Sequence, residues 1–359
     1  MPPPRISRRW PGLLAGAVVA IGAGYVRAAF ADNKEQTLNP FTFVRFNIES
    51  KESVSNNSSL FRLSPWSTKS AEVWQEQWKK GVWSVSIKQP QLQIARDYTP
   101  LPPLPSSPGT QPDPLKGPQD GTSNDGDLNL WIRREVRGEM SNYLHALPLN
   151  AEVEIRGPKI EYQLPDQISR IVFLAGGTGI APALQIAHAL QTRTDSRTEI
   201  KVLWANRSRT DCAGGVSDGF SRTSAKGASW WKFWVGHGKN TAQVNLMETK
   251  DRADQAGAIV NMLSQLKQCS GGMLKVDYFV DDEKTLITPQ HVSQLVHDDQ
   301  QMKSDMGDSG KSLIIISGPD GFVNFWAGPK SWSNGHEVQG PLQGVLGQMQ
   351  ISGWEVVKL

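Results

Sequence analysis

A glycine-rich run at residues 176–182, Gly-Gly-Thr-Gly-Ile-Ala-Pro, has the residue types of a phosphate-binding turn. It follows an apolar, strand-like segment and precedes a helical apolar pattern. Glycines let the backbone approach a pyrophosphate, and the free N–H groups of a helix N-terminus attract an anion. Pro182 suits the first helical turn, but it stands where the usual dinucleotide fingerprint has a third glycine. The run indicates a phosphate site, and a tight turn without a ligand is the alternative.

Two further constellations precede this run. Arg96 and Tyr98 fall on one face of a predicted strand, where a guanidinium can hold a phosphate and a phenol ring can stack on a flat group. Gly138 permits a tight turn, and Ser141 is predicted to cap the short helix that follows it. Three cations stand beside this helix start: Arg133, Arg134 and Arg137. The alternatives are an exposed cross-strand pair and an ordinary N-cap.

A fourth motif ends a buried strand. The strand-like residues 313–317 run into the turn Ser317-Gly318-Pro319. Open α/β sheets bind ligands at the carboxyl ends of their strands, so a turn in this place can line a ligand site. Without its context, a Gly-Pro turn after a strand is ordinary.

Short alternating strands must position the first two motifs. Alternation of apolar and polar residues predicts strands at 41–46, 82–87, 92–96, 128–133 and 152–156, the last ending at Gly157-Pro158. These strands define an antiparallel domain over residues 39–165. Eight prolines between Pro100 and Pro118 interrupt it and predict an exposed loop insertion at 101–126.

The second half of the chain has a helix–strand pattern. Buried-type strands are predicted at 171–175, 201–205, 276–280 and 313–317, with amphipathic helices at 183–190 and 259–266. This alternation indicates a parallel sheet over residues 166–359. A Gly/Ser-rich insertion at 213–229 follows the second strand. The tryptophans beyond it form either a partner-binding patch or a buried edge: Trp230, Trp231 and Trp234.

Composition argues against several classes of protein. The 359 residues carry a net charge of +3, which is too small for a nucleic-acid function driven by phosphate neutralisation. Two cysteines, Cys212 and Cys269, cannot build a disulfide framework, and their surroundings do not resemble a metal site. An α/β or α+β enzyme, a binding protein, or a membrane-tethered form of either remains.

Taken in order, the four motifs resemble the ferredoxin–NADP reductase superfamily and, within it, the NADH–cytochrome b5 reductase branch. The family's R-x-Y-[ST] matches Arg96, Tyr98 and Thr99, and its G-x-x-S matches Gly138 and Ser141. Its G-G-T-G-I-A-P matches residues 176–182 without a gap. Its C-G-P matches Ser317-Gly318-Pro319, with serine in place of cysteine. The resemblance covers residues 40–359 and is diluted by the two insertions.

The resemblance implies an α+β two-domain fold: an antiparallel six-stranded FAD-binding β-barrel, then a Rossmann-like α/β nucleotide-binding domain. It implies that Arg96 binds the FAD phosphates, that Tyr98 lies against the flavin or its ribityl chain, and that Thr99 lies near flavin N5. The implied pyrophosphate contacts are Gly138, Met140 and Ser141. The implied NAD(P)H contacts are Gly176, Gly177, Thr178, Gly179, Gly318 and Pro319.

In the resembled family, hydride passes from NAD(P)H to FAD, and electrons pass on to a haem protein such as cytochrome c or cytochrome b5. The implied catalytic positions are Thr99, Thr178 and Ser317. The serine is expected to slow hydride transfer or to reshape the pocket, because the family has a cysteine beside the nicotinamide. The nucleotide preference is open: Arg207 and Arg209 could accept a 2′-phosphate, whereas Asp211 could favour a free ribose hydroxyl.

The first 31 residues contain four arginines, no acidic residue and an apolar stretch at 12–26. Three interpretations fit: a mitochondrial presequence with a membrane anchor, a secretory signal ending at Ala29-Phe30-Ala31, or an ordinary apolar helix. The first predicts a mitochondrial inner-membrane protein facing the intermembrane space. An anchored mitochondrial start together with the two insertions makes the chain most similar to fungal members of the superfamily that assist haem attachment to cytochromes c. The alternatives are a general NADH–cytochrome b5 reductase and a non-catalytic assembly protein that keeps the fold.

Overall fold

The computed structural model describes residues 38–66, 71–103, 126–193, 198–219, 256–306, 310–349 and 351–359. Several predictions lie outside these ranges: the N-terminal segment 1–31, most of the Pro-rich insertion 101–126, residues 220–229 of the second insertion, and Trp230, Trp231 and Trp234. Across the described ranges, no helix combines the length and the apolar character that a bilayer crossing requires.

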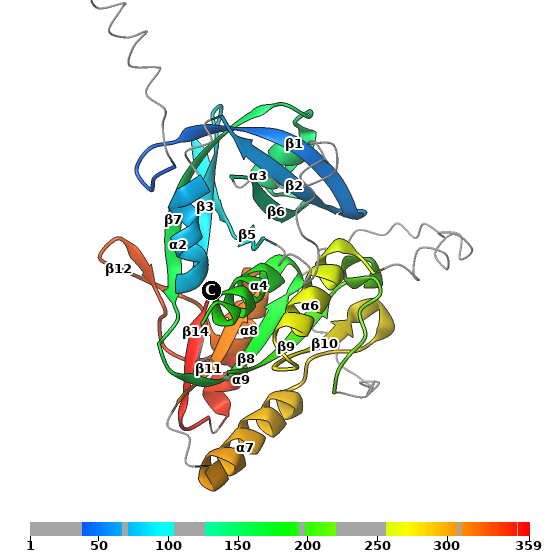
Figure 1. Cartoon of the computed structure of the whole chain (residues 1–359), viewed down its shortest axis with the longest axis vertical. Helices are drawn as coiled ribbons and strands as arrows, with labels where there is room; N and C mark the ends of the chain where they lie inside the picture. Colours follow the sequence, from blue (N-terminus) through cyan, green and yellow to red (C-terminus); the bar gives the residue numbers. More distant parts are fainter. Residues whose placement is uncertain are drawn as a thin grey trace, which may run out of the picture. The chain divides into compact units, whose positions relative to one another are not determined.

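The first half of the chain forms a seven-stranded antiparallel sheet in the order β4-β3-β7-β1-β2-β6-β5 (Figure 1). Its strands are β1 (Val44–Ser55), β2 (Ser58–Pro65), β3 (Gly81–Gln89), β4 (Ile94–Tyr98), β5 (Pro100–Leu101), β6 (Leu128–Arg133) and β7 (Glu152–Gln163). Two helices accompany them, α2 (Ala71–Lys80) and α3 (Glu139–Ala146). Phe46, Phe61 and Trp83 lie in its core. The sheet is barrel-like, as the resemblance implies, but has seven strands instead of six.

Strand β2 is a strand that the sequence pattern did not predict. The polar residues around Asn56-Asn57 look like a loop, but they form the tight turn of a hairpin between β1 and β2. Phe61 and Leu63 of β2 alternate into the core. The neighbouring Leu60 packs against the other apolar cluster, so adjacent apolar residues on both faces of β2 break the alternation that marks a strand.

Strand β7 continues through Gly157-Pro158, where the prediction ended it. The register of β3 against β7 shifts between Ser84 and Ser86, opposite this dipeptide. A Cβ atom at Gly157 would lie 3.1 Å from the carbonyl oxygen of Ser84. The irregular pairing accommodates a residue pair that normally ends a strand.

The second half forms a five-stranded parallel sheet in the order β10-β9-β8-β11-β14 (Figure 1). Its strands are β8 (Ile168–Gly176), β9 (Glu199–Asn206), β10 (Leu274–Val280), β11 (Lys311–Ser317) and β14 (Trp354–Lys358). Helices α4 (Ile180–Gln191) and α6 (Ala258–Cys269) pack on one face. Helices α7 (Pro289–Met306), α8 (Asp320–Ala327) and α9 (Gly344–Gln348) pack on the other. This Rossmann-like arrangement confirms the predicted fold class.

Helix α4 belongs to the second half and also packs on the first. It contacts β3 and β5 of the antiparallel sheet as well as β8 and β9. Val82, Leu101 and Trp131 of the first half lie in the same apolar cluster as the side chains of α4. The two sheets therefore share a continuous core around this helix.

Candidate functional site

Two glycine turns meet at the carboxyl ends of β8 and β11. Strand β8 ends at Gly176, and the short turn η2 (Gly177–Gly179) leads into α4. Strand β11 ends at the buried Ser317, and Pro319 is the N-cap residue of α8. A Cβ atom at Gly179 would lie 2.7 Å from the Cα of Gly318, and one at Gly318 would lie 3.1 Å from the Cα of Gly176. Because only glycine permits this backbone approach, the third and fourth motifs form one surface.

The turn before α4 is held in one conformation by a glycine and an indole. Gly177 has a φ of +55°, the left-handed conformation that favours glycine. The indole N–H of Trp204 on β9 donates to the Gly177 carbonyl at 2.9 Å and so orients the turn. Thr178 is half-buried within it, and the first turn of α4 carries no acidic side chain. This helix start suits an anion.

The first motif lies on β4, an edge strand of the antiparallel sheet. The regular register of β4 against β3 puts Arg96 and Tyr98 on one face, as predicted. Arg96 is exposed, and its guanidinium donates to the carbonyl of Ala95 at 3.0 Å. Tyr98 is half-buried, and burial raises the pKa of its phenol, which Arg96 opposes only in part. Thr99 is half-buried at the point where the chain leaves β4.

The second motif begins α3, and the structure corrects one prediction about it. Gly138 is the N-cap residue, and a Cβ atom there would lie 2.5 Å from the hydroxyl oxygen of Ser141. The prediction that Ser141 caps the helix is wrong: its hydroxyl donates to the Gly138 carbonyl at 3.1 Å and accepts from the Glu135 N–H at 3.1 Å. Ser141 closes the turn because it lies inside the helix, beyond the cap. Met140 is buried in the core of the first sheet.

The three arginines near α3 have different surroundings. Arg133, at the end of β6, forms a buried ion pair with Asp211, with 2.7 Å between Nη2 and Oδ2. The Nε of Arg134 donates to the side-chain oxygen of Asn142 at 2.8 Å, and Arg137 is exposed. Two cations therefore stay at the surface beside α3, whereas the third joins the two halves of the chain.

These contacts gather the four motifs at the junction of the two sheets. Helix α3 contacts β4, which joins the first motif to the second. Strand β6 contacts η2, and a Cβ atom at Gly177 would lie 3.4 Å from Nη2 of Arg133. Helix α4, which begins within the third motif, contacts β5, which directly follows the first motif. The fold thus brings the proposed flavin-binding and nucleotide-binding segments to one place.

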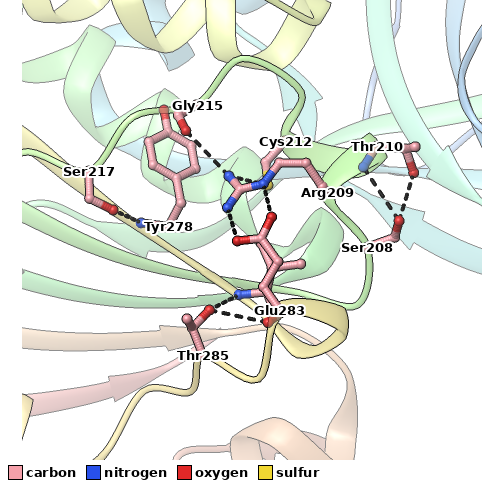
Figure 2. Close-up of polar contacts among 10 residues, drawn as sticks. Ser208, Arg209, Thr210, Cys212, Gly215, Ser217, Tyr278, Glu283 and Thr285 are labelled. Atoms are coloured by element: carbon pink, nitrogen blue, oxygen red, sulfur yellow. Dashed lines mark hydrogen bonds and ion pairs between the residues drawn. The ribbon is translucent and has the colours of Figure 1, made fainter. Parts of the chain in front are cut away.

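Arg209, one of the residues expected to select the nucleotide, is already paired. It lies in η3 (Arg209–Cys212) after β9, and Glu283 lies in η5 (Asp281–Glu283) after β10. Nε and Nη2 of Arg209 donate to the two carboxylate oxygens of Glu283 at 2.7 and 2.6 Å, and Nη1 donates to the Gly215 carbonyl at 3.3 Å (Figure 2). Hydrogen bonding to Glu283 raises the pKa of Arg209. A carboxylate therefore stands where the sequence suggested a free cation.

Asp211, the other expected selector, is buried and already paired within the protein. It is 3% exposed, and its carboxylate is held by Arg133 and, at 3.5 Å, by the hydroxyl of Ser58 on β2. The neighbouring Cys212 is buried, which raises the pKa of its thiol to about 12 and leaves it protonated. Arg207, which the sequence also suggested for contact with a 2′-phosphate, makes an interaction within the protein as well.

Asn206 is an unpaired amide at the ligand edge, and it fits a bound nucleotide. It ends β9 directly after Ala205, which pairs with Gly176 of the glycine turn. It is 2% exposed, and within the described part of the chain neither of its side-chain polar atoms has a hydrogen-bond partner. A buried unpaired amide is costly and calls for an explanation, which a ligand with hydrogen-bonding groups supplies.

Sequence reasoning missed Gln185 at the junction of the two sheets, and it missed Asn206 and Glu283 after strands of the parallel sheet. Gln185 carried a visible signal, because it is an amide in the middle of an otherwise apolar stretch of helix. Glu283 carried no signal in the sequence. It is notable only because it pairs with Arg209, which follows a different strand.

Comparisons with known proteins agree with this organisation. The model of the oxidoreductase FAD-binding domain matches residues 117–164, and that of the oxidoreductase NAD-binding domain matches residues 173–215. The chain is similar to the cytochrome c mitochondrial import factor of Saccharomyces cerevisiae, 28% identical over 230 residues that cover 54% of this chain and 61% of the relative. It is also similar to NADH-cytochrome b5 reductase 1 of Cryptococcus neoformans, 28% identical over 200 residues that cover 55% and 60%. The chain thus spans about three fifths of the length of these relatives.

Among solved structures, the cytochrome b5 reductase domain of Ulva prolifera nitrate reductase is similar, with 16% identity, a TM-score of 0.47, and coverage of 90% of this chain and 99% of that chain. The two matched domain models follow each other in the order of the two sheets and name the cofactors that the motifs imply, FAD and a nicotinamide nucleotide. The chain therefore matches, in sequence order, the models of an oxidoreductase FAD-binding domain and an oxidoreductase NAD-binding domain, and it is similar to NADH-cytochrome b5 reductase 1.

Proposed function

We propose that this chain is a membrane-tethered flavoprotein reductase that takes electrons from NAD(P)H and delivers them to haem or a haem protein, in support of haem attachment to cytochrome c. The observation that carries the proposal is the convergence of the four motifs on the junction between the two sheets, through Arg133 and α4. Bound FAD would supply the chemistry, accepting a hydride (two electrons with one proton) and releasing the electrons singly.

The first half of the chain would bind FAD through its own charged and backbone groups. Arg96 is exposed beside Tyr98, and within the described part of the chain it forms no ion pair with a carboxylate. It would hold the phosphates. Gly138 and Ser141 form the tight turn that would meet the pyrophosphate, together with the backbone of Met140. Tyr98 would lie against the flavin, and Thr99 would donate a hydrogen bond near its reactive edge.

The second half would bind the nicotinamide nucleotide at the two glycine turns. The N–H groups of η2 and of the start of α4 would hold phosphate, and Thr178 would lie beside the nicotinamide. Gly318 and Pro319 would border the same pocket, because Gly318 lies against Gly176. Ser317, buried at the end of β11, would take the place beside the nicotinamide that cysteine has in the resembled family.

The onward partner and the location are inferred from the relatives' names and the first 31 residues. One relative is a cytochrome c mitochondrial import factor and the other a cytochrome b5 reductase, which supports a haem protein as acceptor. The arginine-rich, acid-free start supports a mitochondrial location, with an anchor in the inner membrane and the body in the intermembrane space.

Two alternatives are kept because specific observations favour them. The similarity to NADH–cytochrome b5 reductase 1 favours a general cytochrome b5 reductase. Ser317 in place of cysteine favours an assembly protein that keeps the fold without the chemistry. Rates of electron transfer from the purified protein to cytochrome b5, to cytochrome c and to free haem separate the first two functions.

The decisive test is flavin binding. The full chain, purified in detergent and supplied with FAD, should be yellow and should bleach on addition of NADH or NADPH. Arg96→Ala should lower the bound FAD per polypeptide by at least about tenfold, because it removes a charge-assisted phosphate contact. Arg45→Ala is the matched control: Arg45 is an exposed strand arginine of the same sheet and should not affect FAD content. A colourless wild-type protein with an intact circular dichroism spectrum would refute the proposal.

A further inference from the structure

Gln185 is a fully buried amide at the junction of the two sheets. It lies in the middle of α4 and is 0% exposed. Its Oε1 accepts from the backbone N–H of Trp83 at 2.9 Å, and its Nε2 donates to the carbonyls of Trp83 at 3.1 Å and Pro100 at 2.8 Å. Both amide hydrogens and one oxygen lone pair are used, so the side chain is held in a single orientation.

These bonds fill a gap in the antiparallel sheet. Pairing between β3 and β4 begins at Val85 opposite Tyr98, so β4 does not reach Trp83. The chain leaves β3 at this point and pairs instead with β6, where Pro100 lies opposite Leu130. The backbone of Trp83 is left without a strand on that side, and the amide of Gln185 takes the strand's place.

The gap lies beside the proposed flavin-binding motif. Pro100 directly follows Thr99, the residue proposed to lie near the reactive edge of the flavin. Gln185 is five residues beyond Ile180, where α4 begins after the glycine turn. At a rise of about 1.5 Å per residue, Gln185 lies roughly 7.5 Å along the helix axis from the glycine turn. Its bonds to Trp83 and Pro100 therefore restrain the position of that turn. One side chain thus ties the nucleotide turn to the backbone of the flavin motif.

A second contact restrains the same turn. Arg133 of β6, ion-paired with Asp211, stands 3.4 Å from the Cβ position of Gly177. The turn is therefore restrained by β6 directly and by β3 and β5 through Gln185. Both restraints come from the half of the chain that carries the flavin motifs.

We propose that Gln185 is a positioning residue, which sets the separation and the register between the nicotinamide and the flavin by locking α4 to the crossover at Thr99-Pro100. This inference rests on the proposed reductase function. Hydride transfer needs the two reacting atoms about 3–3.5 Å apart, and a displacement of about 1 Å costs on the order of a hundredfold in rate. A side chain that holds the two binding segments in register therefore acts on the rate of transfer more than on the affinity for either cofactor.

The test compares two variants on α4, each of which replaces a glutamine amide by an apolar side chain. Gln185→Met removes the bonds to the flavin half, whereas Gln191→Met removes the bond from Gln191 to the carbonyl of Leu266 on α6, within the nucleotide half. For each full-length protein we would measure FAD content, the dissociation constant of NADH, the change in the flavin spectrum when NAD⁺ binds, and the single-turnover rate of flavin reduction.

Gln185→Met should keep FAD content and NADH affinity within about twofold, lose the NAD⁺-induced change in the flavin spectrum, and slow flavin reduction by at least about tenfold. Gln191→Met should match the wild type in all four measurements. Equal reduction rates in the two variants would overturn the inference. A wild-type protein that binds no FAD would instead refute the proposed function, so the two failures are distinguishable.

A second variant serves if Gln185→Met does not fold. Gln185→Glu keeps the acceptor for the Trp83 N–H, and in its protonated form it also carries one donor for a backbone carbonyl. Ionisation removes that donor, so the reduction rate of this variant should fall as pH rises, while the wild type and Gln191→Glu show no such step. A rate in Gln185→Glu that follows the wild type at every pH would contradict the positioning role.

Discussion

Glu283 sets a carboxylate beside Arg209 at the edge of the parallel sheet. Its carboxylate holds Arg209 in a bidentate pair, and both residues follow strand ends in the region where α/β folds contact the ribose (Figure 2). A carboxylate there accepts hydrogen bonds from ribose hydroxyls and repels a 2′-phosphate. For the proposed reductase, we therefore predict a preference for NADH over NADPH.

Glu283→Gln should shift this preference, because it removes the negative charge and leaves Arg209 available to a phosphate. The ratio of kcat/KM for NADPH to that for NADH should rise about tenfold, equal to ~1.4 kcal/mol. Steady-state kinetics with both nucleotides measure the ratio. Glu199→Gln is the control, because Glu199 pairs with Arg170 and Lys275 at the opposite end of β9 and should leave the ratio unchanged. An unchanged ratio in Glu283→Gln would show that the adenosine lies elsewhere.

At the scale of the element, β4 is short and lies at the sheet edge, yet it carries Arg96 and Tyr98. Asp97 anchors it: the carboxylate accepts from the hydroxyl of Ser86 and from the ammonium of Lys159 at 2.8 Å. Burial alone would raise the pKa of Asp97, but the hydrogen bonds from Lys159 and Ser86 outweigh it and lower the pKa below its ordinary value of 3.8. The strand that presents the proposed phosphate contact is thus fastened by an ionised side chain.

Asp97→Asn should therefore destabilise the protein in a pH-dependent way. Because the folded pKa is depressed, the stabilisation is fully present above the unfolded pKa and is lost as pH falls through the folded one. Since the carboxylate is partly exposed, we expect a loss of about 1 kcal/mol at about pH 7 that becomes smaller as pH falls below the ordinary pKa of 3.8, measured by urea unfolding at neutral and at acid pH. Glu76→Gln, an exposed change on α2, should alter neither value by more than about 0.5 kcal/mol. A constant difference across pH would exclude the ionised form as the anchor.

At the scale of the whole molecule, the two sheets are joined by the ion pair between Arg133 and Asp211. The side chains are 9% and 2% exposed, and Asp211 also meets Ser58 of β2. The edge-to-face contact of Trp131 with Trp204, at 6.0 Å between ring centroids, lies on the same boundary. Breaking such a pair is costly mainly because the remaining charge stays buried.

Asp211→Asn should cost about 3–5 kcal/mol and separate the unfolding of the two sheets, because it leaves the Arg133 guanidinium buried beside Gly177 without a counter-charge. Calorimetry should show two transitions in place of one. The matched control is Asp277→Asn, which breaks the buried pair with Lys201 inside the parallel sheet. That variant should lower the melting temperature while keeping one transition. A single, unshifted transition in Asp211→Asn would show that the pair does not couple the sheets.

Local patterns sufficed to predict much of this molecule. The apolar runs of β8, β9, β10 and β11 and the glycine turn before α4 are legible because strand and helix periods are local properties. Where local signals conflict, prediction failed: the polar hairpin at Asn56-Asn57 concealed β2, and Gly157-Pro158 suggested an end to β7 that the shifted register of β3 removed. The roles proposed for Arg96, Ser141 and Thr178 stay predictions.

The sequence by itself determined the order of the two domains and the four motifs, since each motif is a short run whose residue types and spacing define it. Tertiary structure alone decided how those motifs are held: Arg133 meets Asp211 across 78 residues of chain, Arg209 meets Glu283 across 74, and Gln185 meets Trp83 across 102. It also paired Asp211 with Arg133 and set Glu283 against Arg209. The physical reason is that a side chain's charge and hydrogen-bonding capacity are properties of its residue, whereas its partner depends on which strands the sheets place side by side.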